Sequence, residues 1–515
     1  MKRKLFHLLP LMAATLLFMV SCSSKSEGTF IPKNASFVCH IDVASLWEKG
    51  DLANADNLQM VQALHSFLQG VSPEGNKIAE ALLKDPASCG IDFRQPLCFF
   101  SETAIEDIPG IDYFVANAKM QNRNQFDNFL ADLEKATGEK LKHCDTLGMT
   151  ALDIDRGMML AYNGDIIFFI YNTPEMLLNG MEDCEGEVLT SKQYLAKLLN
   201  LKKDESMAGN KNFANYLTDR KDISYFMNYG HLMTGTANPV YNIMKQFYGD
   251  KEDGKQLENA SMCFHGSFEN GRIEFTSKTY GIPETLHKIG TQKFNGELLS
   301  YLPAQTLAAF TFSVDMNALA DFLGSMEEMN LDEPLGIDDY TVRDLINALG
   351  GSMAISFYGF QEGLPYFAVA IDLNDSQVAR DLLNELAVNN GNVYSFDFFP
   401  MQLVLNDKVA VLTTDPAVIA NAQAGGKSNG LMTIADKAKK GNYFYMDLNL
   451  EDWPTELLAL IGFDNNPIAT AIFAMFNRIE GETINDNRDG VCNIYLSNDK
   501  ENSLAYILHE VDKMI

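Results

Sequence analysis

The feature that most constrains the fold is a stretch of sequence that occurs twice without a gap. Residues 113–133 read YFVANAKMQNRNQFDNFLADL, and residues 366–386 read YFAVAIDLNDSQVARDLLNEL. Each copy opens with an apolar run, turns at Asn122 or Asp375, and continues with apolar residues at helical spacing. A helix phase that persists while its residues change is typical of a duplicated strand-turn-helix unit, because phase decides which side chains reach the core. We therefore expect two tandem copies of one unit.

Further landmarks follow in the same order in both halves. Asn-Gly and Asn-Asp turns predict β-hairpins over residues 157–172 and 400–415. Prolines at positions that suit a first helical turn predict helix starts at Pro174, Pro416, Pro239 and Pro467. A last hairpin is predicted at the end of each half, over residues 262–278 and 491–508. Hairpins interspersed with helices predict antiparallel sheets covered by helices, an α+β fold.

The order of these landmarks also predicts the domain organisation. A chain of 515 residues is longer than one hydrophobic core usually serves. We expect a signal peptide over residues 1–21, a tether over residues 22–29, a first α+β repeat over residues 30–290 and a second over residues 291–515. The linker between the repeats is expected near residues 281–296, around a Gly-Ile-Pro sequence.

The amino terminus predicts export and lipidation. Three cationic residues, Lys2, Arg3 and Lys4, precede an apolar run that ends at Ser21-Cys22. This pattern is typical of a secretory signal that is cut before a cysteine, so we expect acyl chains on Cys22 and a membrane partner reached through them. Ser23 follows the cysteine where an aspartate would favour the inner membrane, which predicts the outer membrane. Only Glu27 is acidic in the tether, which favours its periplasmic face over the cell surface.

Charge and cysteine content exclude several classes of function. The formal net charge is −29, and removal of the signal peptide takes away three basic and no acidic residues, leaving −32. A chain this acidic repels the phosphate backbones of nucleic acids, so we expect no nucleic-acid partner. Seven cysteines follow Cys22, an odd number, and they lack the CxxC spacing of zinc or redox sites. An oxidising compartment allows one bridge, for instance between Cys89 and Cys98.

Several of these features together resemble a known group of proteins. They are the segment Met19-Val20-Ser21-Cys22, the start Phe30-Ile31-Pro32 with a following strand that ends in Asp42, and the two-copy layout. This combination resembles the uncharacterised two-repeat lipoproteins of Bacteroidetes, a domain-of-unknown-function family. The resemblance implies an exported, lipid-anchored protein of unknown role, and it supplies no active residues.

The sequence offers few candidates for chemistry. His40 and Asp42 are expected to share one face of a strand, where such a pair orients an imidazole or holds a metal. The second half lacks the histidine, and no third or fourth ligand can be placed, so a hydrogen-bonded structural pair is the favoured interpretation. Nucleophile-elbow, phosphate-loop and dinucleotide motifs are absent from the sequence. No catalytic residue, metal or cofactor is predicted.

The remaining candidates are acidic and aromatic residues. Glu327, Glu328, Asp332, Glu333, Asp338 and Asp339 are interpreted as a solvated acidic loop, with weak Ca²⁺ binding as the alternative. Most of the Phe and Tyr residues fall at strand or helix positions that predict core packing.

These observations favour a non-enzymatic binding or structural lipoprotein of the cell envelope, with an unidentified protein or glycan partner left open. The alternative is an envelope hydrolase that uses carboxylates in a cleft between the two halves.

Overall fold

The computed structural model describes residues 27–103, 112–138, 140–155, 157–173, 189–228, 260–325, 330–336, 339–361, 364–396, 401–427, 437–438, 444–460, 462, 467–484 and 488–514. The chain divides into two compact units. Unit 1 comprises residues 1–246, 257–270 and 500–515, and unit 2 comprises residues 247–256 and 271–499.

This division differs from the predicted repeat boundary at residues 290 and 291. Residues 271–290 lie in unit 2 because strand β10 (Arg272–Tyr280) pairs along its length with β20 (Asp489–Leu496). Residues 500–515 lie in unit 1, where helix α21 (Ser503–Asp512) contacts helix α3 (Val43–Lys49) and strand β9 (Ser261–Glu269). Long-range pairing of strands therefore determines which residues belong to each compact unit. The predicted boundary was placed from the order of landmarks along the sequence.

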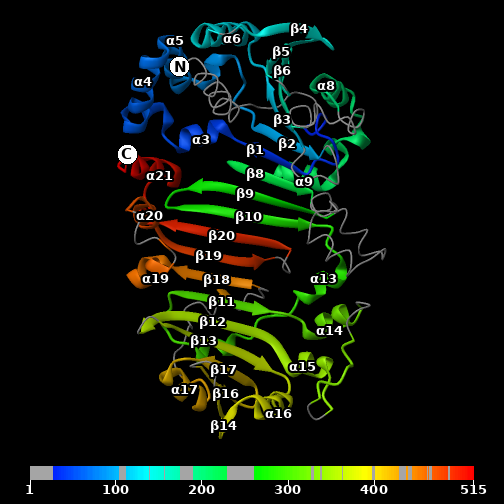
Figure 1. Cartoon of the computed structure of the whole chain (residues 1–515), viewed down its shortest axis with the longest axis vertical. Coiled ribbons are helices and arrows are strands. Elements are labelled where there is room, and N and C mark those ends of the chain that lie inside the picture. Colours follow the sequence, from blue (N-terminus) through cyan, green and yellow to red (C-terminus); the bar gives the residue numbers. More distant parts are fainter. Residues whose placement is uncertain are drawn as a thin grey trace. The chain divides into compact units, whose positions relative to one another are not determined.

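Unit 1 is built on an antiparallel sheet with the strand order β9–β8–β1–β2–β3–β7–β6–β5–β4 (Figure 1). The other strands are β1 (Phe37–Ile41), β2 (Leu97–Thr103), β3 (Asp112–Lys119), β4 (Lys142–Thr146), β5 (Met149–Asp155), β6 (Met158–Tyr162), β7 (Ile166–Asn172) and β8 (Ile223–Asn228). Its other helices are α4 (Gln59–Val71), α5 (Pro73–Lys84), α6 (Arg123–Thr137), α8 (Ser191–Asn200) and α9 (Lys211–Thr218).

Helices lie on both faces of the unit 1 sheet. On one face, Phe126 and Leu130 of α6 join Leu97, Ala118 and Ile167 in a buried core. On the other face, Tyr194 of α8 and Tyr216 of α9 are fully buried, and each bonds to a group on a strand, as described below. Figure 1 shows α6 beside strands β4 to β6, and Val43 of α3 and Leu82 of α5 pack against the same core.

Unit 2 is built on an antiparallel sheet with the strand order β10–β20–β19–β18–β11–β12–β13–β17–β16–β15–β14. The other strands are β11 (Ala308–Ser313), β12 (Leu349–Gln361), β13 (Leu364–Leu373), β14 (Val388–Asn390), β15 (Val393–Ser395), β16 (Gln402–Leu405), β17 (Val409–Thr413), β18 (Phe444–Asn449) and β19 (Phe476–Ile484). The helices are α13 (Glu284–Ile289), α14 (Met316–Gly324), α15 (Val342–Ala348), α16 (Ser376–Leu386), α17 (Pro416–Gln423), α19 (Thr455–Leu460) and α20 (Pro467–Phe473).

Many of the predicted elements are confirmed. The two stretches at residues 113–133 and 366–386 each form a strand, a turn and a helix, as β3 and α6 and as β13 and α16. Asn122 and Asp375 are the helix N-caps, and each side chain accepts a backbone N–H of the first turn, which is why the helices begin there. The hairpins β6–β7 and β16–β17 and the helix starts at Pro416 and Pro467 are also as predicted.

The predicted last hairpin over residues 491–508 is wrong. Strand β20 ends at Leu496, and Asn502 then caps helix α21 by accepting the backbone N–H of Leu504. The apolar residues after Asn502 recur at helical spacing, so the alternation of β20 does not continue past this cap. The helix starts at Pro174 and Pro239, and residues 1–26 with Cys22, lie outside the described residues. No helix within the described ranges is long and apolar enough to cross a membrane.

A candidate ligand-binding face

The structure places His40 and Asp42 in separate structural roles. His40 is 2% exposed, and its Nδ1 lies 2.8 Å from the hydroxyl of Tyr216, which in turn donates to the carbonyl oxygen of Ser224 at 2.9 Å. Burial, and next the charge of Arg220, hold the pKa of His40 well below its usual value, so it is neutral at pH 7. Asp42 follows the strand and caps α3 by accepting the N–H of Ser45 at 2.9 Å. The two side chains therefore serve different partners.

The buried carboxylates are also occupied. Of the six buried carboxylates among the described residues, five are paired with cations: Asp92 with Arg94, Glu102 with Lys197, Asp222 with Lys49, Asp447 with Arg478 and Glu480 with Lys437. The sixth, Asp512, accepts the backbone N–H of Met60 at 2.7 Å. A buried charge needs such compensation, so these groups are accounted for by folding, and none of them supports the hydrolase alternative.

Metal and thiol chemistry find little support in the described part of the chain. Over those residues, no group of three or more His, Cys, Asp or Glu side chains is arranged to hold a metal ion. Burial raises the pKa of Cys39 to about 11 and that of Cys89 to about 12, which keeps both thiols protonated. Cys89 is a free thiol that donates to the carbonyl oxygen of Pro86, so the bridge to Cys98 is not formed.

The two faces of the unit 2 sheet differ in an unusual way. The face that packs against residues 294–302 and α17 carries small side chains on the central strands, among them Ala309, Ala354, Ala368 and Ala370. These alanines are at most 1% exposed, because Leu298, Leu299 and other large residues of the covering segment fill the space above them. The large apolar side chains of the same strands must therefore point to the opposite face.

That opposite face carries two rows of directly opposed, mainly apolar residues. The first row crosses eight strands: Phe275, Cys492, Gly481, Met446, Phe310, Ile355, Val369 and Leu412. The second crosses seven strands: Ile273, Ile494, Ile479, Leu448, Ala308, Phe357 and Phe367. We call these two rows the open face. At about 4.8 Å per strand, the first row is about 34 Å long, and the rows lie about 7 Å apart.

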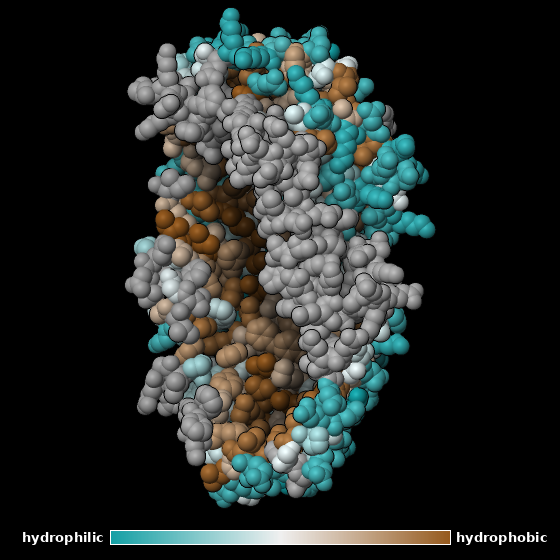
Figure 2. Space-filling model, turned by 45° about the vertical axis from the view of Figure 1, so that its right-hand side comes forward, coloured by the Kyte–Doolittle hydropathy of each residue, from teal (hydrophilic) through white to brown (hydrophobic). Residues whose placement is uncertain are grey.

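The open face is incompletely covered. Phe275 is 40% exposed and Phe357 is 39% exposed, and most of the other side chains in the two rows are half-buried. Apolar residues gather on this side of unit 2, where the surface is hollowed (Figure 2, lower half). Leaving large apolar side chains in water costs about 25 cal/mol for each Å² that could be buried, so a continuous patch of them indicates a binding surface.

Unit 1 carries a comparable face. One row of opposed residues runs through Phe264, Tyr225, Cys39, Phe99, Ala116, Phe169 and Leu160. Phe264 is 37% exposed, and Phe114, two residues away from this row, is 36% exposed. Aromatic residues that the sequence assigned to the core thus lie on partly exposed sheet faces in both units, because period-two alternation gives the direction of a side chain and says nothing of what covers it.

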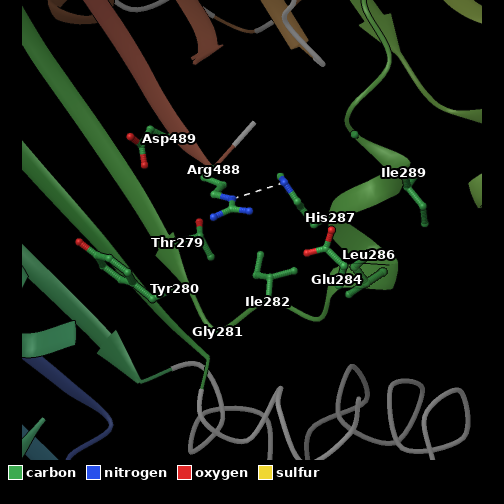
Figure 3. A pocket seen from close by; sticks show the side chains of 11 residues that line it. Thr279, Tyr280, Gly281, Ile282, Glu284, Leu286, His287, Ile289, Arg488 and Asp489 are labelled. Atoms are coloured by element: carbon green, nitrogen blue, oxygen red, sulfur yellow. Dashed lines mark hydrogen bonds between the residues drawn. The ribbon is translucent and has the colours of Figure 1, made fainter. Parts of the chain in front are cut away.

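A cavity of about 730 Å³ adjoins one corner of the open face in unit 2. It lies between the ends of β10 and β20 and helix α13, and Arg488, His287 and Glu284 are among its lining residues (Figure 3). Thr279 donates its backbone N–H to the carbonyl oxygen of Arg488 at 3.0 Å, which continues the β10–β20 ladder. Opposed residues share a face, so Arg488 lies on the same side of the sheet as Cys492 and Ile494.

The charged groups of the cavity are weakly engaged. Nε of Arg488 donates to Nε2 of His287 at 3.4 Å, and Figure 3 shows the two side chains pointing toward each other. Within the described ranges, no carboxylate lies within ion-pair distance of Arg488, and Glu284 likewise makes no ion pair. The cavity therefore combines an available cation and an available carboxylate with the apolar side chains of Ile282 and Leu286.

Sequence reasoning missed this site. Arg488 is not among the candidate residues named from the sequence, and His287 and Glu284 fall in the predicted linker. A usable signal was the alternation in β11, where Phe310 and Phe312 alternate with Ala309, Thr311 and Ser313. Small residues on one face of a strand leave room there for a covering segment. The aromatic residues on its opposite face are then available to a different partner.

Comparisons with known proteins give a family and little more. The solved structure described as "Structure of crystal form I of TP0453" matches with 8% sequence identity over 75% of this chain and 93% of that chain. Its TM-score is 0.18, so no argument is drawn from it. No curated protein matches this chain. Residues 28–504 match the model of DUF4836, a domain of unknown function, and the chain belongs to that family.

Proposed function

We propose that this chain is an exported envelope lipoprotein of two α+β repeats, acylated on Cys22, that holds the acyl chains of a lipid on the open face of unit 2. It acts by binding and not by catalysis. The observation that carries the proposal is the open face of unit 2, two parallel rows of mainly apolar side chains that the helices of the unit leave partly exposed.

Acyl chains suit this face better than a protein partner does. A protein surface brings backbone and side-chain polar groups, and interfaces usually contain about one hydrogen bond for every 100–200 Å². The two rows offer those groups only sulfur and hydrocarbon, so buried polar groups of a protein would lose their hydrogen bonds to water without replacement. Hydrocarbon chains carry no such groups and gain about 0.8 kcal/mol for each buried CH₂.

The proposal of two repeats is supported by the strand orders of the two units. The order β9–β8–β1–β2–β3–β7–β6–β5–β4 in unit 1 corresponds strand for strand to β19–β18–β11–β12–β13–β17–β16–β15–β14 in unit 2. An alignment of family members would test it: we expect helix caps at the positions of Asn122 and Asp375 in both halves. Members with a first half that lacks the strand-turn-helix unit would contradict a duplication.

The lipid anchor rests on the amino-terminal sequence and needs its own test. We expect labelled palmitate to be incorporated into the wild-type protein in cells and to be absent from Cys22→Ala. Equal labelling of the two proteins would exclude an anchor on Cys22. Protease treatment of intact cells would then distinguish the expected periplasmic face of the outer membrane from the cell surface.

Lipid binding can be measured on the full chain carrying Cys22→Ala, which has no acyl chains of its own. The probe is a diacylglycerol with a pyrene label, which offers hydrocarbon and no charge. We expect saturable binding that weakens about tenfold in Phe357→Gln, because a large apolar contact is lost. Phe67→Gln is the matched control, since Phe67 is 52% exposed on α4 of unit 1, outside the open face.

Three outcomes would exclude the proposed function. One is the absence of saturable diacylglycerol binding. A second is an equal loss of binding in Phe67→Gln and Phe357→Gln, which would indicate nonspecific adsorption to exposed aromatic residues. A lipid-free dimer that dissociates in Phe357→Gln would also exclude it, since the open face would then be an interface between two copies of the chain.

A further inference from the structure

We infer that unit 2 takes a diacyl phospholipid with a zwitterionic, amine-bearing head group, which lies in the cavity lined by Arg488, His287 and Glu284 while its two acyl chains follow the two rows of the open face. This inference rests on the proposed function and adds the class of lipid and its orientation to it.

The first support is a change in polarity along the strands that lead to the cavity. On the open side of β10, the residues read Ile273, Phe275, Ser277 and Thr279 toward the cavity. On β20, the opposed residues read Ile494, Cys492, Gly490 and Arg488. The face therefore passes from hydrocarbon to hydroxyl and then to a guanidinium, which is the order of groups along an amphiphile.

The second support is that, in the next row of opposed residues, the polar side chains lie at this corner. The next row of opposed residues begins with Ser277, Gly490 and Thr483 on β10, β20 and β19. It continues with Phe312, Met353 and Ile371 on β11, β12 and β13, which are apolar. A head group therefore finds polar partners beside β10 and β20, whereas acyl chains find apolar contacts across the rest of the sheet.

The third support is the pair of opposite charges in the cavity. The guanidinium of Arg488 has no carboxylate partner within the described ranges, and it presents N–H donors in a geometry that suits a phosphodiester. Glu284 lies on α13, one helical turn before His287, and offers a carboxylate to an ammonium group. Figure 3 shows both side chains in the same cavity as Arg488. Phosphate and amine of one head group would satisfy both charges.

Net charge argues for a neutral lipid. The chain carries a formal charge of −29, so an anionic lipid is repelled at long range, whereas a zwitterionic phospholipid is not. The cavity volume of about 730 Å³ lies in the range of sites for small molecules, which leaves room for the head group and the glycerol to which both acyl chains are joined. Two rows about 7 Å apart match two chains side by side.

The test compares three pyrene-labelled lipids that share their acyl chains: phosphatidylethanolamine, phosphatidylglycerol and diacylglycerol. Each is titrated into the full chain carrying Cys22→Ala. We expect phosphatidylethanolamine to bind about tenfold more tightly than diacylglycerol, as one charge-assisted contact predicts. Adding Arg488→Gln should reduce this difference, because the phosphate loses its N–H donors. Adding Glu284→Gln should reduce the preference for phosphatidylethanolamine over phosphatidylglycerol, because the amine loses its carboxylate.

The outcomes separate this inference from the proposed function. If all three lipids bind equally to the unaltered cavity, or if Arg488→Gln keeps the tenfold difference, the head-group site is excluded while acyl-chain binding stands. Tighter binding of phosphatidylglycerol would overturn the zwitterionic class. Failure of all three lipids to bind would exclude the proposed function itself. Urea unfolding of each variant shows that it is folded, and Lys135→Gln, an exposed cation on α6 of unit 1, controls for general charge effects.

Discussion

Two cations, Lys49 in unit 1 and Arg488 in unit 2, illustrate the difference between a charge used for folding and a charge available to a ligand. Nζ of Lys49 lies 2.7 Å from Asp222, whose carboxylate also accepts the hydroxyl of Ser45 at 2.6 Å. Arg488 is exposed in a cavity, and its side chain makes a long hydrogen bond of 3.4 Å from Nε to Nε2 of His287.

The environment of the partner explains this difference. Asp222 is 4% exposed and accepts the backbone N–H of Phe268 as well as Lys49, so its burial depends on all of these donors. No such buried carboxylate depends on Arg488 within the described ranges. A cation whose removal leaves no carboxylate unpaired contributes little to folding, so the guanidinium of Arg488 is available to the proposed ligand.

The largest effect is expected for Lys49→Met. The substitution leaves a buried carboxylate without its cation, and such losses cost about 2–4 kcal/mol of unfolding free energy. Urea unfolding of the full chain should show this loss of unfolding free energy in the transition in which unit 1 unfolds. Lys135→Met, which removes an exposed ion pair with Asp132 on α6, should leave that transition unchanged, and an equal effect of the two variants would contradict the comparison.

A smaller effect is expected from acid, through His40. Its pKa is lowered in the folded protein, so below the unfolded value of about 6.5 the unfolded chain binds more protons and stability is lost as pH falls. The loss is about 1.4 kcal/mol for each pH unit below that value. Urea midpoints measured between neutral and mildly acidic pH should show this slope, and His40→Gln should reduce it. An unchanged slope in the variant would assign the effect to other groups.

A smaller effect still is expected for Phe275→Ala on the open face. Phe275 is 40% exposed, so its removal should cost about 1 kcal/mol, far below the 3–5 kcal/mol of a fully buried phenylalanine. Phe294→Ala is the matched variant within unit 2, since Phe294 is 5% exposed in the core of the covered face. Similar losses in both variants would show that the open face is packed as a core.

The smallest effect is expected for Arg488→Met, which should change the unfolding free energy by less than about 0.5 kcal/mol. The only described hydrogen bond of its side chain joins Nε to His287 at 3.4 Å, near the limit of such bonds. Urea unfolding, as for Lys49→Met, provides the comparison of the two unfolding free energies. A loss that approaches that of Lys49→Met would mean that Arg488 supports the fold, and the head-group site would lose its main argument.

The sequence by itself determined the local elements of this protein. Asn122 and Asp375 predicted where α6 and α16 begin, because an N-cap acts on the backbone of its own first turn. Asn163 predicted the β6–β7 turn for a similar reason, since its side chain accepts the N–H groups of Asp165 and Ile166. Short-range hydrogen bonds can be read from neighbouring residues, and the α+β class follows from the elements they delimit.

Only the tertiary structure decided what each sheet face contacts. Phe310 and Phe357 appeared in the sequence as core residues, and they lie on the open face because the covering segment 294–302 packs on the alanines of the opposite face. The same holds for Arg488 and His287, which are about two hundred residues apart and meet because β10 pairs with β20. Alternation along a strand fixes two directions, whereas the partner in each direction depends on residues distant in the chain.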